Sequence, residues 1–336
     1  MRQPREDGYA MVPDWAPHDR CWLAWPSREE GWGDALESAR RDVAEIAQAI
    51  AHFEPVTVIA RPEFVAMASL YCGPGITTLG LPHDDGWLRD VGPCFLRGPD
   101  GLAGATFIFN GWGERRADHA RDADLGRRLL EHVGLRRFAS GMVLEPSVVQ
   151  VDGEGTCIAA SGVLLDPKRN PGLSEAEAEA ELVAMLGVER VIWLAGGLDE
   201  TSGEPVESVA IFVRPGLVLA LATEDQSDPA FAALAENVAR LRAAVDARGR
   251  TLEVITVPLP KARSGPDGRP LALSHLGCYL ANGAVVMPTF GGNSDKAAAR
   301  AFAAAWPDRQ IVPVDCLDLL LGGGGIRAIT LGQPTA

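Results

Sequence analysis

The sequence predicts a mixed α/β or α+β architecture that is built from repeated units. Helical patterns alternate with short apolar runs along the 336 residues, and apolar pairs that resemble hairpins lie between them. Hydrophobic residues make up 47% of the chain, which is enough to form a sizeable buried core. Because helices, strands and hairpins recur in the same order, we expect several similar structural units packed together.

The first unit is predicted from a change in hydrophobic period. The segment 35–53 carries Val43, Ile46 and Ile50 at the spacing that places side chains on one face of a helix. The apolar run 56–60 follows directly and is typical of a buried strand. This order predicts a helix that packs on a neighbouring sheet.

A second unit has sequence signals at both ends of its helix. Ser174 and Glu177 have the spacing of a capping box, which satisfies free backbone groups at a helix start. The helix is expected to end at Leu186, because Gly187 readily adopts the left-handed conformation that terminates helices. The apolar segment 191–194 is then predicted to be a buried strand.

The remaining units follow the same order. Helices are predicted over 227–247 and 294–306, and strands over 252–257 and 311–314. Hairpins or adjacent strands are predicted at 106–109, 157–165, 209–213 with 217–222, and 278–288. The segment 261–270 is the best loop candidate, but it is too short to separate domains. We therefore predict a single domain over residues 1–336.

Composition excludes several classes of partner. The formal net charge is −14, whereas a protein that binds phosphate backbones needs clustered surplus Lys and Arg. No apolar run reaches the roughly 18–20 residues that span a bilayer, and residues 2–7 contain no apolar core of a secretory signal. We expect a cytoplasmic protein that binds neither nucleic acid nor membrane, and that could form a homo-oligomer.

The six cysteines give no sign of a metal centre. They are dispersed, none forms a C-x-x-C pair, and no histidine lies near them at zinc-ligand spacing. In a chain without a signal this pattern is typical of reduced, buried thiols in the cytosol. We predict no metal and no cofactor.

Several segments together resemble the agmatine deiminase and bacterial peptidylarginine deiminase family, over nearly the whole chain. Each is weak alone, but their order and spacing are specific. The segments are 11–18, 84–93, 109–113, 151–156, 166–171, 281–283, 288–291 and 322–330. The resemblance implies the pentein fold, an α+β (α/β propeller) arrangement of about five ββαβ-type units in pseudo-fivefold order around a central pocket.

The family hydrolyses a guanidinium group through a cysteine thiolate, and part of its binding machinery has counterparts here. Asp90 matches the carboxylate of the family's Trp-x-Arg-Asp motif, which holds the guanidinium. Asp84 and Trp87 match neighbouring family positions, and Glu145 matches the Glu before the family's Gly-Gly pair. Carboxylates suit a planar cation because they accept paired, charge-assisted hydrogen bonds. The resemblance thus implies a ligand that is cationic or zwitterionic.

The family's catalytic positions are replaced. Ala328 stands at the nucleophilic cysteine, and Arg327 replaces the preceding histidine. Pro205 falls on the histidine of the Asp-Gly-His-Val-Asp motif, which acts as general base, and Glu207 falls on its last aspartate. Gln150 replaces a further family histidine. Since a methyl group cannot attack carbon and proline cannot accept a proton, we expect thiol-dependent agmatine hydrolysis to be absent.

Three functions remain open. The first is a repurposed enzyme that acts non-covalently on a guanidino, amidino or amino-acid-type molecule in specialised biosynthesis, through C–N bond hydrolysis, elimination or cyclisation, with Asp90, Glu207 and Arg327 as catalytic residues. The second is a pseudoenzyme that binds a cationic small molecule or a partner. Arg327 could contact the ligand, take part in catalysis or plug the pocket.

The third function is a deiminase-type hydrolase that uses a displaced residue. Its thiol candidates are Cys94, Cys278 and Cys316. Each lies in an apolar context, so we interpret all three as core residues. This makes a displaced thiol the weakest of the three hypotheses.

Overall fold

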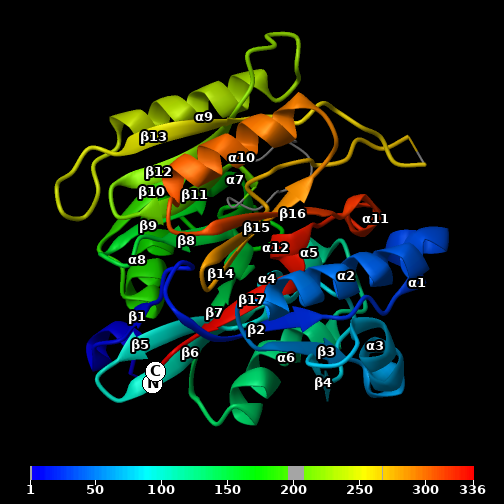
Figure 1. Cartoon of the computed structure of the whole chain (residues 1–336). Helices are drawn as coiled ribbons and strands as arrows, with labels where there is room; N and C mark the ends of the chain where they lie inside the picture. Colours follow the sequence, from blue (N-terminus) through cyan, green and yellow to red (C-terminus); the bar gives the residue numbers. More distant parts are fainter. Residues whose placement is uncertain (1, 196–207, 267) are drawn as a thin grey trace. The chain divides into compact units, whose positions relative to one another are not determined.

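The computed structural model describes residues 2–195, 208–266 and 268–336 (Figure 1). Within these residues the strands form five sheets, two of four strands and three of three strands. In each sheet a strand pair leads into a helix and then a further strand. This bears out the expectation of five ββαβ-type units.

The first sheet contains the first strand of the chain and has the strand order β1-β5-β6-β7. Its strands are β1 (Ala10–Met11), β5 (Cys94–Gly98), β6 (Gly101–Ile108) and β7 (Arg136–Val143), and helix α6 (Ala120–His132) connects the last two. β5 and β6 are antiparallel, whereas β6 and β7 are parallel. A parallel pair needs a long crossover, which α6 provides.

Two three-stranded sheets repeat this plan. One contains β8 (Val149–Val151), β9 (Thr156–Ala160) and β10 (Arg190–Leu194), with helices α7 (Ser161–Leu164) and α8 (Glu175–Leu186) between β9 and β10. The other contains β11 (Ala210–Arg214), β12 (Leu217–Ala222) and β13 (Glu253–Pro258), with α9 (Phe231–Ala243) before β13. In Figure 1, α9 lies along the β11–β13 sheet.

The fourth sheet contains β14 (Tyr279–Ala281), β15 (Ala284–Thr289) and β16 (Gln310–Asp315), and α10 (Asn293–Ala305) connects the last two. β14 and β15 form an antiparallel hairpin, and β15 and β16 are parallel. Short helices α11 (Leu317–Leu320) and α12 (Ile326–Ile329) follow β16.

The fifth sheet joins the two ends of the chain. β17 (Thr330–Pro334) pairs antiparallel with β2 (His18–Ala24), which pairs in parallel with β3 (Val56–Ala60). Helix α2 (Leu36–Ala51) connects β2 to β3, and α3 (Val65–Cys72) leads to the edge strand β4 (Thr77–Gly80). The last strand of the sequence thus supplies the first strand of this ββαβ unit.

The remaining helical segments are single turns. They are η1 (Pro4–Asp7), α1 (Glu29–Trp32), η2 (Gly33–Ala35), η3 (Pro62–Phe64), α4 (Leu88–Val91), α5 (Gly111–Glu114) and η4 (Pro146–Val148). No helix in the described part of the chain is both long and apolar enough to cross a membrane.

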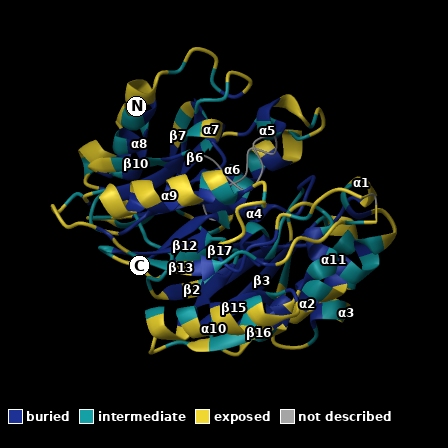
Figure 2. Cartoon of the chain, turned by 90° about the horizontal axis from the view of Figure 1, so that it is seen from above, coloured by how far each residue is buried: buried dark blue, intermediate teal, exposed yellow. Residues whose placement is uncertain are grey.

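The chain forms two compact units. The first comprises Met1–Ala16, Asp90–Thr256 and Ala336, and the second comprises Pro17–Arg89 and Val257–Thr335. Each has its own buried sheets, while α9 in the first unit and α10 in the second expose one face to solvent (Figure 2). The single domain over 1–336 remains a prediction.

Most predicted elements are confirmed within one or two residues, and three differ. The strand predicted at 106–109 begins already at Gly101. The helix expected over 227–247 begins only at Phe231, because Asp225 and Asp228 accept hydrogen bonds from nearby backbone N–H groups in turns. The segment 157–165 is strand only to Ala160 and then turns into α7. The capping box at Ser174 is present as expected.

Candidate functional site

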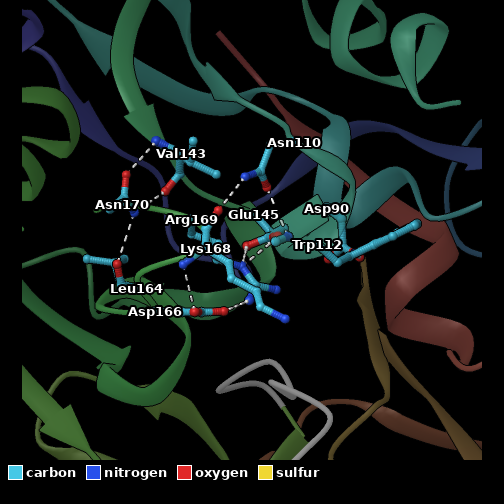
Figure 3. Close-up of polar contacts among 11 residues, drawn as sticks. Asp90, Asn110, Trp112, Val143, Glu145, Leu164, Asp166, Lys168, Arg169 and Asn170 are labelled. Atoms are coloured by element: carbon cyan, nitrogen blue, oxygen red, sulfur yellow. Dashed lines mark hydrogen bonds and ion pairs between the residues drawn. The ribbon is translucent and has the colours of Figure 1, made fainter. Parts of the chain in front are cut away.

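Asp90, the first of the predicted ligand carboxylates, lies in the first unit and is held by hydrogen-bond donors. The Trp112 indole Nε1 donates to Asp90 Oδ2 over 2.9 Å (Figure 3). Burial raises the pKa of Asp90 to about 6, and the negative charge of Glu145 adds to the rise. The Ser147 hydroxyl, the Trp112 indole and the positive charge of Arg169 oppose it. Asp90 is therefore an aspartate that changes charge close to neutral pH.

Glu145, the second predicted carboxylate of this unit, forms an internal ion pair. Arg169 Nε lies 3.0 Å and 3.1 Å from the two Glu145 carboxylate oxygens. Arg169 NH1 also donates to Asp166 Oδ2 over 2.9 Å (Figure 3). The side chains of Glu145 and Arg169 are each only 2% exposed. The Glu145 carboxylate is thus already paired with a guanidinium of the protein itself, that of Arg169.

Asn170 fixes the segment that carries Arg169. Its Oδ1 accepts a hydrogen bond from Val143 N, and its Nδ2 donates to the carbonyl oxygens of Val143 and Leu164. One amide side chain therefore ties the turn after α7 to the end of β7 (Figure 3). Asn170 thereby positions the backbone of the residue before it, Arg169.

Gln150, which stands at a family histidine position, lies in β8 and is 4% exposed. Its Oε1 accepts a hydrogen bond from the backbone N–H of Phe212 over 3.1 Å. Its Nε2 is buried without a hydrogen-bond partner in the part of the chain that the structure describes. Gln150 thus links β8 to β11.

Asp84 lies in the second unit, also inside an ion pair. Arg28 NH2 is 3.2 Å from Asp84 Oδ1, and Arg28 Nε donates to the Asp84 carbonyl oxygen. Arg61 NH2 donates to the same carbonyl over 2.6 Å. Asp84 is 8% exposed, so most of its surface is covered by these contacts and the surrounding chain.

Trp87 lies against the glycine run Gly322–Gly325 in the second unit. The rings of Trp32 and Trp87 lie 5.2 Å apart. A Cβ atom on Gly322 would lie 2.3 Å from the Trp32 ring, and one on Gly324 would lie 2.6 Å from the Trp87 ring. The backbone thus approaches the two indoles closely at Gly322 and Gly324, because a side chain at either position would overlap a tryptophan ring.

Arg327 and Ala328 lie in α12, directly after the glycine run. Arg327 is 3% exposed, and its NH1 lies 3.4 Å from the Cys278 carbonyl oxygen. Ile329, on the other side of Ala328, is fully buried, whereas Ala328 itself is half-buried. Ala328, which matches the family's nucleophile, is thus more accessible than its two sequence neighbours, Arg327 and Ile329.

All six cysteines are buried thiols outside any disulfide, as expected. Burial raises the pKa of Cys72 to about 12, and burial also raises the pKa values of Cys21, Cys157 and Cys316 well above the usual range of a thiol. Cys278 is fully buried and lies in the core. Among the described residues, no group of three or more His, Cys, Asp or Glu side chains is placed to hold a metal ion.

Several predicted site residues are brought together within a unit. Asp90 and Glu145 belong to one unit, and Asp84, Trp87, Arg327 and Ala328 to the other. Pro205 and Glu207 lie outside the described residues. Sequence reasoning missed the roles of Trp112 and Arg169, although both lie in family-like motifs, and of Arg28 and Ser147, for which no motif signalled a role.

Comparison with known proteins agrees with this fold. The family model for Porphyromonas-type peptidyl-arginine deiminase matches residues 10–334. The chain belongs to this family, which includes the agmatine deiminases and has the pentein fold.

Individual relatives match from end to end. A Legionella pneumophila protein provisionally named agmatine deiminase is 42% identical, over 98% of this chain and 96% of its own. The agmatine deiminase of Stutzerimonas stutzeri is 38% identical, over 98% and 97%. The solved agmatine deiminase of Enterococcus faecalis superposes with a TM-score of 0.96 at 29% identity, over 100% and 98%.

Proposed function

We propose that this chain binds a guanidino, amidino or amino-acid-type small molecule and acts on it by non-covalent chemistry, without a cysteine thiolate. The observation that carries the proposal is the half-buried Ala328 between the buried Arg327 and Ile329. Matched by sequence to the family's nucleophile, this position has a methyl group, which cannot form a covalent intermediate.

The other cysteines support the same reading. A reactive cysteine needs thiolate character and access to solvent or substrate. All six thiols are buried, and burial raises the pKa of Cys72 to about 12. A displaced thiol nucleophile is therefore disfavoured. Six cysteines outside any disulfide also fit the reducing cytoplasm, where we propose the protein resides.

Asp90 supports the cationic ligand. Its carboxylate is held by Trp112, is half-buried, and ionises near pH 6. Relatives that match almost the whole chain are named agmatine deiminase, and agmatine carries a guanidinium. Because a carboxylate pairs with a guanidinium through charge-assisted hydrogen bonds, we propose Asp90 as the ligand's anchor. Glu207 and Arg327 remain proposed catalytic residues.

A second candidate, a binding protein without catalysis, is favoured by a separate observation. Three of the charged site residues are engaged within the protein. Glu145 pairs with Arg169, Asp84 pairs with Arg28, and Arg327 donates to a backbone carbonyl. Groups used in this way are less available to move protons on a ligand. Only a search for turnover can separate this candidate from the first.

The test combines binding with turnover. Agmatine should raise the melting temperature of the wild-type protein, because a ligand that binds the native state stabilises it. Asp90→Asn should lose this effect, whereas Asp100→Asn, at an exposed loop position in the same unit, should keep it. The wild-type protein should release no ammonia from agmatine.

The outcomes are distinct. Ammonia release that survives stringent purification contradicts the loss of thiol chemistry. No melting shift with agmatine, arginine or their ureido products contradicts the cation site. If compounds raise the melting temperature and mass spectrometry recovers all of them unchanged, the result favours the binding protein over the enzyme. Conversion of a bound compound, unaffected by thiol-blocking reagents, supports the first proposal.

A further inference from the structure

The turn Asn110–Glu114 carries unusual backbone strain. Trp112 has φ 59° and ψ 49°, and Glu114 has φ 63°. They are the two non-glycine residues with positive φ in the described part of the chain. The left-handed conformation is unfavourable for a residue with a Cβ atom, because the Cβ approaches the following carbonyl oxygen. Such strain persists only where the surroundings impose it, and it is concentrated at functional sites.

Asn110 imposes this conformation from inside the turn. Its Oδ1 accepts a hydrogen bond from Gly113 N over 3.0 Å, which closes the turn around Trp112. Its Nδ2 donates to the Lys168 carbonyl oxygen over 3.0 Å, which anchors the turn to the segment before Arg169 (Figure 3). One side chain therefore bonds both the interior of the turn, at Gly113, and the neighbouring segment, at Lys168.

The consequence of the strained turn is the direction of one indole. The Trp112 ring lies 4.9 Å from the Phe109 ring in an edge-on contact. Its Nε1 then reaches Asp90 Oδ2 at 2.9 Å. Trp112 is half-buried, and its indole N–H makes a specific hydrogen bond to the Asp90 carboxylate in addition to the packing of the ring. This hydrogen bond fixes the direction of the indole.

We propose that Trp112 is a positioning residue for Asp90, and that the strained Asn110–Glu114 turn is retained because it aims the indole N–H at this carboxylate. The bond orients the Asp90 carboxylate and favours its charged form, which is the form that binds a cation. The proposal rests on the function proposed above, because it assigns Trp112 to the ligand's anchor.

The local charges agree with this role. Among the described residues, the groups with the largest effects on Asp90 are the charges of Glu145 and Arg169 and the hydrogen-bond donors Ser147 and Trp112. Burial and Glu145 favour the protonated carboxyl, whereas the two donors and Arg169 favour the carboxylate. Removing the indole donor should therefore make Asp90 hold its proton to higher pH.

Trp112→Phe is the decisive variant, because it keeps an aromatic ring and removes only the N–H donor. Trp193→Phe is its matched control. Trp193 Nε1 donates to Glu179 Oε1, also over 2.9 Å and in the same unit, far in sequence from Asp90. Both variants lose one indole–carboxylate hydrogen bond, so a general effect on stability should appear in both.

The measurements are agmatine binding by calorimetry from pH 5 to 8, and the titration of Asp90 by carboxyl NMR in the ligand-free protein. In Trp112→Phe we expect agmatine binding at pH 7 to weaken about tenfold. The pH midpoints of binding and of the Asp90 titration should both move upward. Trp193→Phe should leave binding and both midpoints at wild-type values.

Each result decides something specific. If the Asp90 midpoint is the same in Trp112→Phe and wild type, the positioning role is wrong, whether or not agmatine binds. If the wild type does not bind agmatine, the proposed function fails, and the NMR titration still tests Trp112. If Trp112→Phe does not fold, Asn110→Ala replaces it, since this change frees the turn and should shift the same midpoint.

Discussion

Asp42 tests how burial changes the pKa of a carboxyl group and, through it, the stability of the protein. It lies in α2 and its Oδ2 accepts a hydrogen bond from Leu319 N over 2.9 Å. Burial raises the pKa of Asp42 from 3.8 to about 7, against the opposing hydrogen bond from Leu319. The negative charges of Asp318, Asp315 and Glu45 add to the rise.

The sign of the effect follows from proton binding. Between about pH 4 and pH 7 the folded protein keeps the Asp42 proton that the unfolded chain has lost. Stability therefore falls as pH rises through this window, and the loss is complete above pH 7. A pKa difference of about three corresponds to about 4 kcal/mol. Because Asp42 is half-buried, solvent screening reduces this to about 2 kcal/mol.

Asp42→Asn isolates this contribution. The asparagine oxygen can still accept from Leu319 N, but it has no charge to bury. Urea unfolding at pH 4, 6 and 8 should show the wild type losing about 2 kcal/mol more than the variant over this range. Asp34→Asn, at an exposed site in the same unit, should follow the wild type. Parallel curves for wild type and Asp42→Asn would refute the reasoning.

Two further predictions concern packing and charge. Gly322→Ala should lower the free energy of unfolding by about 1–3 kcal/mol, because its Cβ would overlap the Trp32 ring; Gly31→Ala, with open space around it, should not. Arg169→Met should cost about 3–5 kcal/mol in urea unfolding by leaving Glu145 buried and unpaired. Adding Glu145→Met should recover most of that loss, and no recovery would contradict the ion-pair assignment.

Local elements were predictable because their signals are local. Strand β3 (Val56–Ala60) and the capped helix α8 (Glu175–Leu186) occur where the periodicity and the capping box predict them. The helix near residue 227 was predicted too long, because apolar spacing does not register turns at Asp225 and Asp228 that use the same backbone donors.

Pairing between distant segments could not be predicted from the same signals. β17 pairs with β2, so the end of the chain completes the unit that its beginning starts. β17 contains a single large apolar residue, Leu331, so its sequence alone does not identify its partner. The register depends on hydrogen bonds between residues roughly 300 positions apart, and no local pattern encodes that choice.

The sequence alone determined the chemical inventory of this protein. It established the family resemblance, the carboxylate at Asp90, and the absence of a thiol at Ala328, because a side chain's chemistry needs no neighbours to be known. Tertiary structure decided how that inventory is used. Glu145 is neutralised by Arg169, and Asp90 is held by the indole of a strained Trp112. Availability of a charge depends on what folding places within about 3 Å of it, and only the folded chain decides that.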